Sequence, residues 1–251
     1  MSGIGPGKFG IITVNVHTWL LFTNYKHRFI VLAEGCKNQL ACFRIQYGTI
    51  ELTSSTNRSG GIYLKKAQAT IIALLIADLP ETFVTRRISE TLLEFGGIRG
   101  DRHFGITSKA DSRQPMFPRG TEILNRRQIT IVSQEELQQI ADELGIDQIK
   151  LEWLGANLLV KGFPDLTKLT LGSRILFPSG AGLICMGENM PCTLPGEEIQ
   201  QHYEGHDKLA TRFVKAGYKR RGIVCAVERP GLIHETDEVQ ILLNDYANPM
   251  Q

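Results

Sequence analysis

The chain has 251 residues, of which 42% are hydrophobic and 22% charged, and its formal net charge is +2. This composition predicts a soluble globular protein of one large domain or two small ones. It argues against a membrane protein, because the longest apolar run, residues 69–77, is much shorter than the roughly 20 residues that cross a bilayer.

The N-terminus lacks the basic and apolar regions of a secretory signal, so we expect a cytoplasmic protein without a membrane partner. Residues 1–66 contain eight Lys/Arg and two Asp/Glu, whereas the remainder of the chain contains 20 Lys/Arg and 24 Asp/Glu. The excess of basic residues is therefore confined to the N-terminal part. Basic residues confined to a poorly patterned end do not predict a nucleic-acid partner. Five cysteines without a CxxC pair argue against a disulfide framework and against a structural zinc site.

Residues 1–66 show little regular patterning. The stretches "ITVNVHTWLLF" and "FIVLAEG" have the composition of strands, and "TSSTNRSGG" at residues 53–61 has that of a linker. We therefore expect residues 1–66 to be an extension of unknown function, either disordered or translated from a misassigned start. Residues 67–251 are expected to form the main domain.

The pattern sharpens from residue 69 onward. "TIIALLIA" predicts a central strand and residues 87–95 a half-buried one, followed by the glycine-rich "GGIRGDRHFG" and a long polar loop from 106 to about 125. "RQITIVS" predicts another strand, and Ser133 and Glu136 form a capping-box pattern that begins a helix. Gly145 is placed to end that helix. Its apolar face comprises Leu137, Ile140, Ala141 and Leu144.

The remaining chain is expected to contain several further short strands and, besides a helix start near residues 196–198, one further helix. The strands are expected in "ANLLVKG", "SRILFPSG", "GLICMG", "GIVCAVERPG" and "DEVQILL", and the helix at residues 206–217. Many short strands, few helices and no regular alternation between them predict a mainly β fold, a barrel or a sandwich.

Five segments in a fixed order resemble the MOSC domain family, named for the C-terminal part of molybdenum cofactor sulfurases. They are "GGIRGDRHFG", "RQITIVSQEEL", "WLGANLLVKG", "GENMPC" and "KRRGIVCAVERPG". The resemblance covers about 175 residues and implies a mainly β, MOSC-type barrel with a few peripheral helices. In this family, sulfurases carry an additional pyridoxal-phosphate desulfurase domain, and amidoxime-reducing proteins carry an additional β-barrel half. Neither addition fits in the 66 residues that precede the resemblance, so the chain resembles a stand-alone MOSC protein.

The resemblance also implies a cofactor and partners. We expect Mo-molybdopterin, the molybdenum cofactor, together with a small-molecule substrate, such as an N-hydroxylated compound, and oxidoreductase chemistry. The alternatives are a sulfur carrier that holds a persulfide, or a cofactor chaperone. A separate cysteine desulfurase or electron-transfer protein is then the expected protein partner.

Cys192 is the candidate catalytic residue and metal ligand. It lies in "NMPCTLPG", where Pro191 and Pro195 keep the backbone out of regular strand geometry, and a helix start at about 196–198 favours its thiolate. A thiolate suits a soft metal or persulfide sulfur. The alternative is an incidental surface cysteine. Cys185 and Cys225 lie in apolar strands and are expected in the core.

The loop at residues 96–105 supplies the next candidates. Its glycines let backbone N–H groups approach an anion, and Arg99, Arg102 and His103 add polar side chains suited to a phosphate or a pterin edge. Asp101 is a cofactor-binding candidate as well, or the residue that shapes the turn. The alternative is a glycine-rich hairpin whose charges face water.

Four further residues complete the expected cofactor-binding set: Asn157, Glu188, Asn189 and Arg221. Arginine suits bidentate phosphate contacts, although residues 219–221 also fit a solvated basic run. Glu188 and Asn189 flank Cys192 but also fit an ordinary turn. His202 and His206 have the spacing of a metal pair, and without a supporting carboxylate we expect them to be surface residues.

Overall fold

The computed structural model describes residues 65–244 and four preceding strands at residues 11–14, 18–22, 29–33 and 41–43. The chain divides into two compact units, Met1–Tyr63 and Leu64–Gln251. The described strands of the first unit form an antiparallel sheet in chain order: β1 (Ile11–Val14), β2 (Thr18–Phe22), β3 (Phe29–Ala33) and β4 (Ala41–Phe43). Strands are therefore present where expected, whereas the predicted linker at 53–61 lies outside the described residues.

The second unit is built around a closed β-barrel. Its seven strands are β5 (Lys66–Ile76), β11 (Ile129–Ser133), β12 (Leu158–Lys161), β13 (Arg174–Leu176), β14 (Gly182–Glu188), β15 (Ile223–Arg229) and β17 (Glu238–Leu242). They pair in the order β12-β11-β15-β14-β13-β17-β5, and a pairing between β5 and β12 closes the ring. All these pairs are antiparallel except β11–β12. The expectation of a mainly β barrel is confirmed.

Smaller β elements surround the barrel. A short strand, β6 (Arg86–Ile88), pairs with β5 beyond the ring. A three-stranded sheet contains β7 (Glu90–Glu94), β8 (Gly97–Ile98) and β16 (Gly231–His234), and a separate hairpin contains β9 (Thr107–Lys109) and β10 (Glu122–Leu124).

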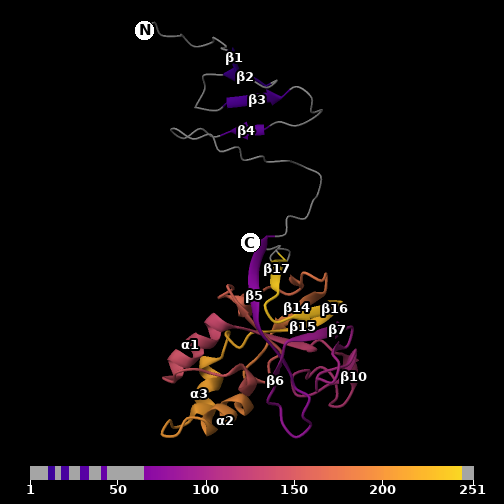
Figure 1. Ribbon diagram of the computed structural model, residues 1–251, viewed down its shortest axis with the longest axis vertical. Coiled ribbons are helices and arrows are strands. Elements are labelled where there is room, and N and C mark those ends of the chain that lie inside the picture. Colours follow the sequence, from indigo (N-terminus) through magenta and orange to yellow (C-terminus); the bar gives the residue numbers. More distant parts are fainter. Residues whose placement is uncertain (1–10, 15–17, 23–28, 34–40, 44–64, 245–251) are drawn as a thin grey trace. The chain divides into compact units, whose positions relative to one another are not determined.

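Three α-helices, α1 (Gln134–Leu144), α2 (Thr193–Gln201) and α3 (Leu209–Ala216), lie together beside the barrel (Figure 1). Two short 3-10 helices, η1 (Leu151–Leu154) and η2 (Leu166–Lys168), connect the remaining elements. Among the described residues, none of the helices has the length and apolar character needed to cross a membrane.

Two hydrophobic cores stabilise this arrangement. Ile71 and Leu74 of β5 belong to the core inside the barrel, whereas Ala73 and Leu75 of the same strand pack in the core beneath the helices. Successive side chains of a strand point to opposite faces, so a strand covered on both faces is apolar throughout. This explains the continuous run "TIIALLIA". The predicted apolar face of α1 is buried, and Gly145 ends the helix in a left-handed conformation (φ 71°).

Three local predictions need correction. The single strand expected at residues 87–95 is two strands, because β6 pairs with the barrel and β7 pairs with β16 on the other side of Ser89. The loop expected at 106–125 contains the β9–β10 hairpin. The capping box is only half formed: Ser133 accepts the Glu136 N–H, but the Glu136 carboxylate binds the backbone N–H and hydroxyl of Thr167 instead.

Candidate functional site

A cavity of about 240 Å³ lies where several loops of the second unit meet, and Cys192 is part of its wall. Its polar lining residues are Arg102, His103, Arg113, Arg127, Thr130, Asn189, Cys192 and Arg221. Its other lining residues are Phe83, Leu154, Gly155, Met190, Leu194 and Pro195. All of these lie in the described part of the chain, and none is Asp or Glu. The cavity therefore suits an anion.

Cys192 lies between β14 and α2, as the N-cap residue of α2 in extended geometry (φ −134°, ψ 175°). The helix begins at Thr193, earlier than the predicted start at 196–198, because Pro195 fits in a first turn, where backbone N–H groups have no partner in the helix. The thiol is free, half-buried and makes no capping hydrogen bond. Its sulfur is therefore available at the positive end of a helix dipole.

The other two described cysteines are both free and buried in the barrel core, as expected. Burial raises the pKa of the Cys185 thiol and raises that of Cys225 well above its ordinary value. Only Cys192 among these three combines a free thiol with access to a cavity.

Three of the four arginines in the cavity are held by neutral oxygen atoms. Arg102 donates to the Thr82 carbonyl at 3.1 Å, Arg127 to the Asn189 side-chain oxygen at 2.7 Å, and Arg221 to the Leu154 carbonyl. Arg113, by contrast, pairs with the Asp111 carboxylate. The positive charges of Arg102, Arg127 and Arg221 are thus left for an anionic ligand to balance.

Arg221 is the most deeply placed of these cations. It is 4% exposed, and burial lowers its pKa to about 10. Its Nη1 atom is buried and has no hydrogen-bond partner within the described residues. Buried polar atoms are rarely left in this state, so the nitrogen is suited to donate to a bound group. A negative charge on Cys192 would oppose the fall in the pKa of Arg221.

Arg221 is positioned by an unusual backbone turn. Gly222 follows it with φ +80°, and a Cβ at this glycine would lie 2.0 Å from the Ile131 carbonyl oxygen. Only glycine fits a left-handed turn against a neighbouring strand so closely. The Gly222 N–H donates to the Thr167 hydroxyl, and its carbonyl accepts from the Asn189 N–H. The turn therefore ties Arg221 to the Asn189 side of the cavity.

A family model for the MOSC domain matches residues 100–240. The chain belongs to the MOSC domain family. YuaD of Bacillus subtilis (strain 168), named as a candidate metal-sulfur cluster biosynthesis protein, is 54% identical over 177 residues, which cover 70% of this chain and 92% of YuaD. The crystal structure of the Bacillus subtilis YuaD protein aligns with a TM-score of 0.70 and 52% identity, covering 72% of this chain and 99% of that one.

In this MOSC domain the glycine-rich loop at residues 96–105 is largely satisfied by its own hydrogen bonds. The backbone N–H groups of residues 101 to 105 all donate within the protein, to Ile98, Ala77, Asp101 and Gly96. The expected row of free backbone donors is therefore absent for these five residues. Anion binding here depends on side chains.

Asp101 is the centre of this loop. Its carboxylate accepts from the Ala77 N–H, the Asn157 side-chain amide, and both the backbone N–H and the ring of His103. Burial opposes the charge, but these hydrogen bonds lower the pKa of Asp101 overall. The contact with the His103 N–H forms the turn considered in the sequence analysis. Neither Asp101 nor Asn157 lines the cavity, and both hold residues that do.

The charged residues of this MOSC loop separate into two groups. Arg102 and His103 line the cavity, whereas Arg99 pairs with Glu94 and lies over the Phe104 ring at 5.2 Å. Glu188 does not line the cavity and accepts the Lys219 N–H. The structure thus brings together five of the eight expected site residues: Arg102, His103, Asn189, Cys192 and Arg221.

Two histidines considered for metal binding have other contacts. His202 stacks on Trp153 at 4.1 Å and pairs with Glu198, and His206 meets the Tyr203 ring edge-on. His202 therefore packs the end of α2 against η1, and His206 packs on Tyr203 in the segment that follows α2.

Sequence analysis missed Arg113 and Arg127. Arg127 lies two residues before the buried β11, and burial together with the Arg113 charge lowers its pKa. The available signal was its place at the start of "RQITIVS", since a residue at the end of a barrel strand lies at the barrel rim. The place of Arg113 depends on the fold of the long loop, which the sequence pattern does not reveal.

Proposed function

We propose that this MOSC domain binds the molybdenum cofactor, with Cys192 as the thiolate ligand of the metal and the surrounding arginines as ligands of the phosphate. The observation that supports this most strongly is the shared cavity: a free cysteine and four arginines line it without a carboxylate. Membership of the MOSC family agrees with it.

The residues present fit such a group chemically. A soft thiolate is a suitable ligand for a transition metal, and guanidinium groups match the geometry of phosphate oxygens. The unpartnered Nη1 of Arg221 would gain an acceptor from a bound anion. Arg102 and Arg127 are already oriented by neutral acceptors, so they keep their charge for the ligand.

When bound, the cofactor would supply the redox chemistry for oxygen-atom transfer on a small substrate, such as an N-hydroxylated compound. The protein's own residues would hold the anion, present the Cys192 sulfur and fix its surroundings. Asp101 acts through His103, which it orients at 3.0 Å, and the Gly222 turn places Arg221. Electrons would come from a separate protein.

The first experiment measures the cofactor directly. The parent protein, purified from cells that make the molybdenum cofactor, should contain molybdenum and a fluorescent oxidised pterin in comparable amounts. Cys192→Ser should lose molybdenum more than pterin, because a hydroxyl is a poor ligand for a soft metal while the arginines remain. Thr193→Ala, at the next position, is the matched control. A parent protein with neither metal nor pterin would contradict the proposal.

A second function, sulfur transfer, is favoured by the free half-buried thiol and by the name of YuaD, which refers to metal-sulfur clusters. In this reaction the Cys192 thiolate attacks the outer sulfur of a donor persulfide. A new sulfur–sulfur bond forms, the donor's own bond breaks, and the donor leaves as a thiolate. The expected donor is a cysteine desulfurase.

Mass spectrometry distinguishes this second function. Incubation of cofactor-free protein with a persulfide donor should add one sulfur atom that dithiothreitol removes, and Cys192→Ser should gain none. Loading at Cys185 or Cys225 instead would show that the wrong thiol carries the sulfur.

A further inference from the structure

A second pocket, of about 590 Å³, lies next to the Cys192 cavity and shares Arg127 with it. It is lined by Ser108, Gln114, Met116, Phe117, Thr121, Glu122, Ile123, Leu124, Arg126 and Arg127, which come from the β9–β10 hairpin and the residues that follow it. Its volume falls within the range of roughly 300–1,000 Å³ that is typical of small-molecule sites.

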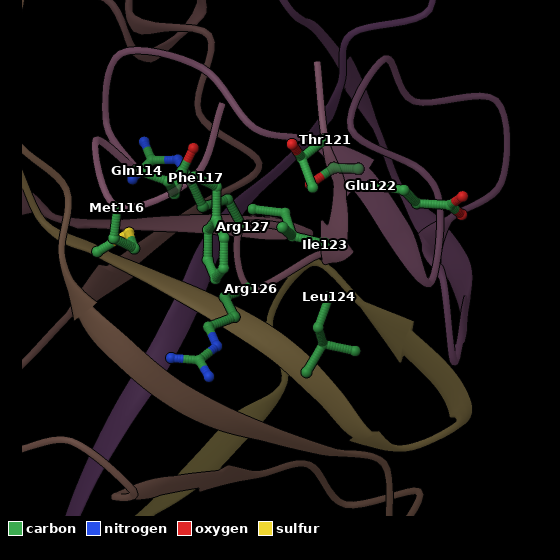
Figure 2. Close-up of a pocket in the computed structure, with 10 residues that line it drawn as sticks. Gln114, Met116, Phe117, Thr121, Glu122, Ile123, Leu124, Arg126 and Arg127 are labelled. Carbon is green, nitrogen blue, oxygen red and sulfur yellow. The ribbon is translucent and has the colours of Figure 1, made fainter. Parts of the chain in front are cut away.

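Large apolar side chains form much of this pocket, although they are exposed to solvent. Met116 is 70%, Phe117 46% and Leu124 59% exposed. Figure 2 shows Met116 and Phe117 on one side and Ile123 and Leu124 on the other. Three such side chains around one hollow are unfavourable in water unless something covers them.

Cationic groups accompany the apolar wall. Within the described part of the chain, the Arg126 side chain has neither an ion pair nor a hydrogen bond, and it lines the pocket. Arg127 borders both pockets and donates to Asn189 beside the Cys192 cavity. The carboxylate of Glu122 is engaged by the Thr107 hydroxyl. The pocket therefore combines an apolar surface with two arginines, of which Arg127 also borders the Cys192 cavity.

We propose that this pocket binds the planar aromatic ring of an anionic molecule whose charged end reaches the Cys192 cavity past Arg127. An aromatic ring would cover Phe117 and Leu124, and its face would attract the Arg126 guanidinium. The inference rests on the proposed function, because it assigns the adjacent cavity to an anion. The ring belongs either to the bound cofactor or to a separate aromatic substrate.

The test uses 8-anilinonaphthalene-1-sulfonate, an aromatic anion that fluoresces when it binds an apolar site. The parent chain should bind it saturably, and Phe117→Ser and Leu124→Ser should each weaken binding at least fivefold. Arg126→Gln should weaken it severalfold. Leu171→Ser is the matched control, because Leu171 is 60% exposed and lies elsewhere, and it should bind as the parent does.

A second apolar hollow, lined by residues such as Leu92, Phe95 and Ile106, offers the competing site for this probe. If Leu92→Ser abolishes the signal while Phe117→Ser and Leu124→Ser do not change it, the proposal is wrong. If the control Leu171→Ser weakens binding as much as Leu124→Ser does, the proposal is wrong as well.

Competition identifies the source of the ring. Displacement by pterin-6-carboxylate but not by 2-naphthoate assigns the pocket to the cofactor, and the reverse assigns it to a substrate. Alkylation of Cys192 in the presence of inorganic phosphate tests the adjacent cavity separately. Failure of phosphate to slow alkylation in the parent counts against the proposed function, whereas unchanged dye binding in Phe117→Ser and Leu124→Ser counts against this inference.

Discussion

Two regions that meet at the Cys192 cavity use their polar groups in opposite ways. In the loop at residues 96–105, five consecutive backbone N–H groups and the Asp101 carboxylate all have partners within the protein. At Arg221, by contrast, a buried guanidinium nitrogen has no described partner. The glycine-rich, charged loop thus has a structural role, because it holds residues of the cavity wall in place. A ligand is expected instead at Arg221, whose buried nitrogen still lacks an acceptor.

The largest expected effect is on stability, and it comes from the Asp101 carboxylate in the loop at residues 96–105. Asp101→Ala removes the acceptor of the Ala77 N–H and leaves the Asn157 amide only its 3.4 Å contact with the Leu75 carbonyl, so it should lower the free energy of unfolding by about 3–5 kcal/mol. Urea denaturation measures this. Asp142→Ala, on the exposed side of α1, is the control and should stay within about 0.5 kcal/mol of the parent. A loss below about 1 kcal/mol for Asp101→Ala would show that the loop does not depend on this carboxylate.

The second prediction concerns Glu136, a buried carboxyl that accepts fewer hydrogen bonds than Asp101 does. Burial raises the pKa of Glu136 from 4.5 to about 7, against the hydrogen bonds from Thr167. The folded protein therefore holds a proton that the unfolded chain releases, so this residue's contribution is lost as pH rises from about 4.5 through 7. Glu136→Gln should equal the parent near pH 4.5 and exceed its stability above pH 7 by on the order of 3 kcal/mol.

The neighbouring Glu135 provides the control of opposite sign. Burial raises its pKa, but the hydrogen bonds from the Gly162 N–H and the Ser133 hydroxyl lower it overall. Its contribution is present at neutral pH and lost on acidification, so Glu135→Gln should be less stable than the parent at pH 7. Denaturation curves from pH 4 to 8 compare the two. A stability difference for Glu136→Gln that does not change with pH would rule out the titration.

The third prediction addresses the unused donor. Arg221→Met removes a buried charge that is incompletely hydrogen-bonded, so stability should change by no more than about 1 kcal/mol. Protection of Cys192 against iodoacetamide by inorganic phosphate should weaken at least tenfold, or about 1.4 kcal/mol. Arg220→Met is the control, because Arg220 pairs with Glu143 outside the cavity. Equal protection in Arg221→Met and the parent would remove Arg221 from the site.

Local patterns were sufficient to predict most of the fold. Apolar runs such as the one in β5 and the periodic face of α1 locate elements because burial dictates them. The sequence did not reveal that β6 and β7 belong to different sheets or that residues 106–125 contain a hairpin. The first depends on the pairing of β6 with β5 and of β7 with the distant β16, and the second on the pairing of β9 with β10 across a long polar loop. The role of Glu136 was misread for the same reason, since its partner Thr167 is 31 residues away.

The site was predictable in its residue types but less so in its geometry. Cys192 and Arg221 were identified from a proline-bracketed loop, a basic run and the family resemblance. Asp101 and Asn157 have side chains that could bind a cofactor, but they are hydrogen-bonded to each other instead. This contact forms only because the fold brings β5, β11 and the loop at residues 96–105 together, which the sequence pattern does not reveal.

The smallest expected effect separates two arginines of the same loop. Arg102 donates to the Thr82 carbonyl and lines the cavity, whereas Arg99 is paired with Glu94 and packs on Phe104 away from it. Arg102→Ala should reduce phosphate protection of Cys192 severalfold, because the charge-assisted hydrogen bond to phosphate is lost. The melting temperature should change little, because the hydrogen bond from Arg102 to the Thr82 carbonyl is exposed to solvent. Arg99→Ala should leave both quantities unchanged. If the two variants behave alike, the loop acts through its general charge, and the distinction between its supporting and ligand-facing residues is wrong.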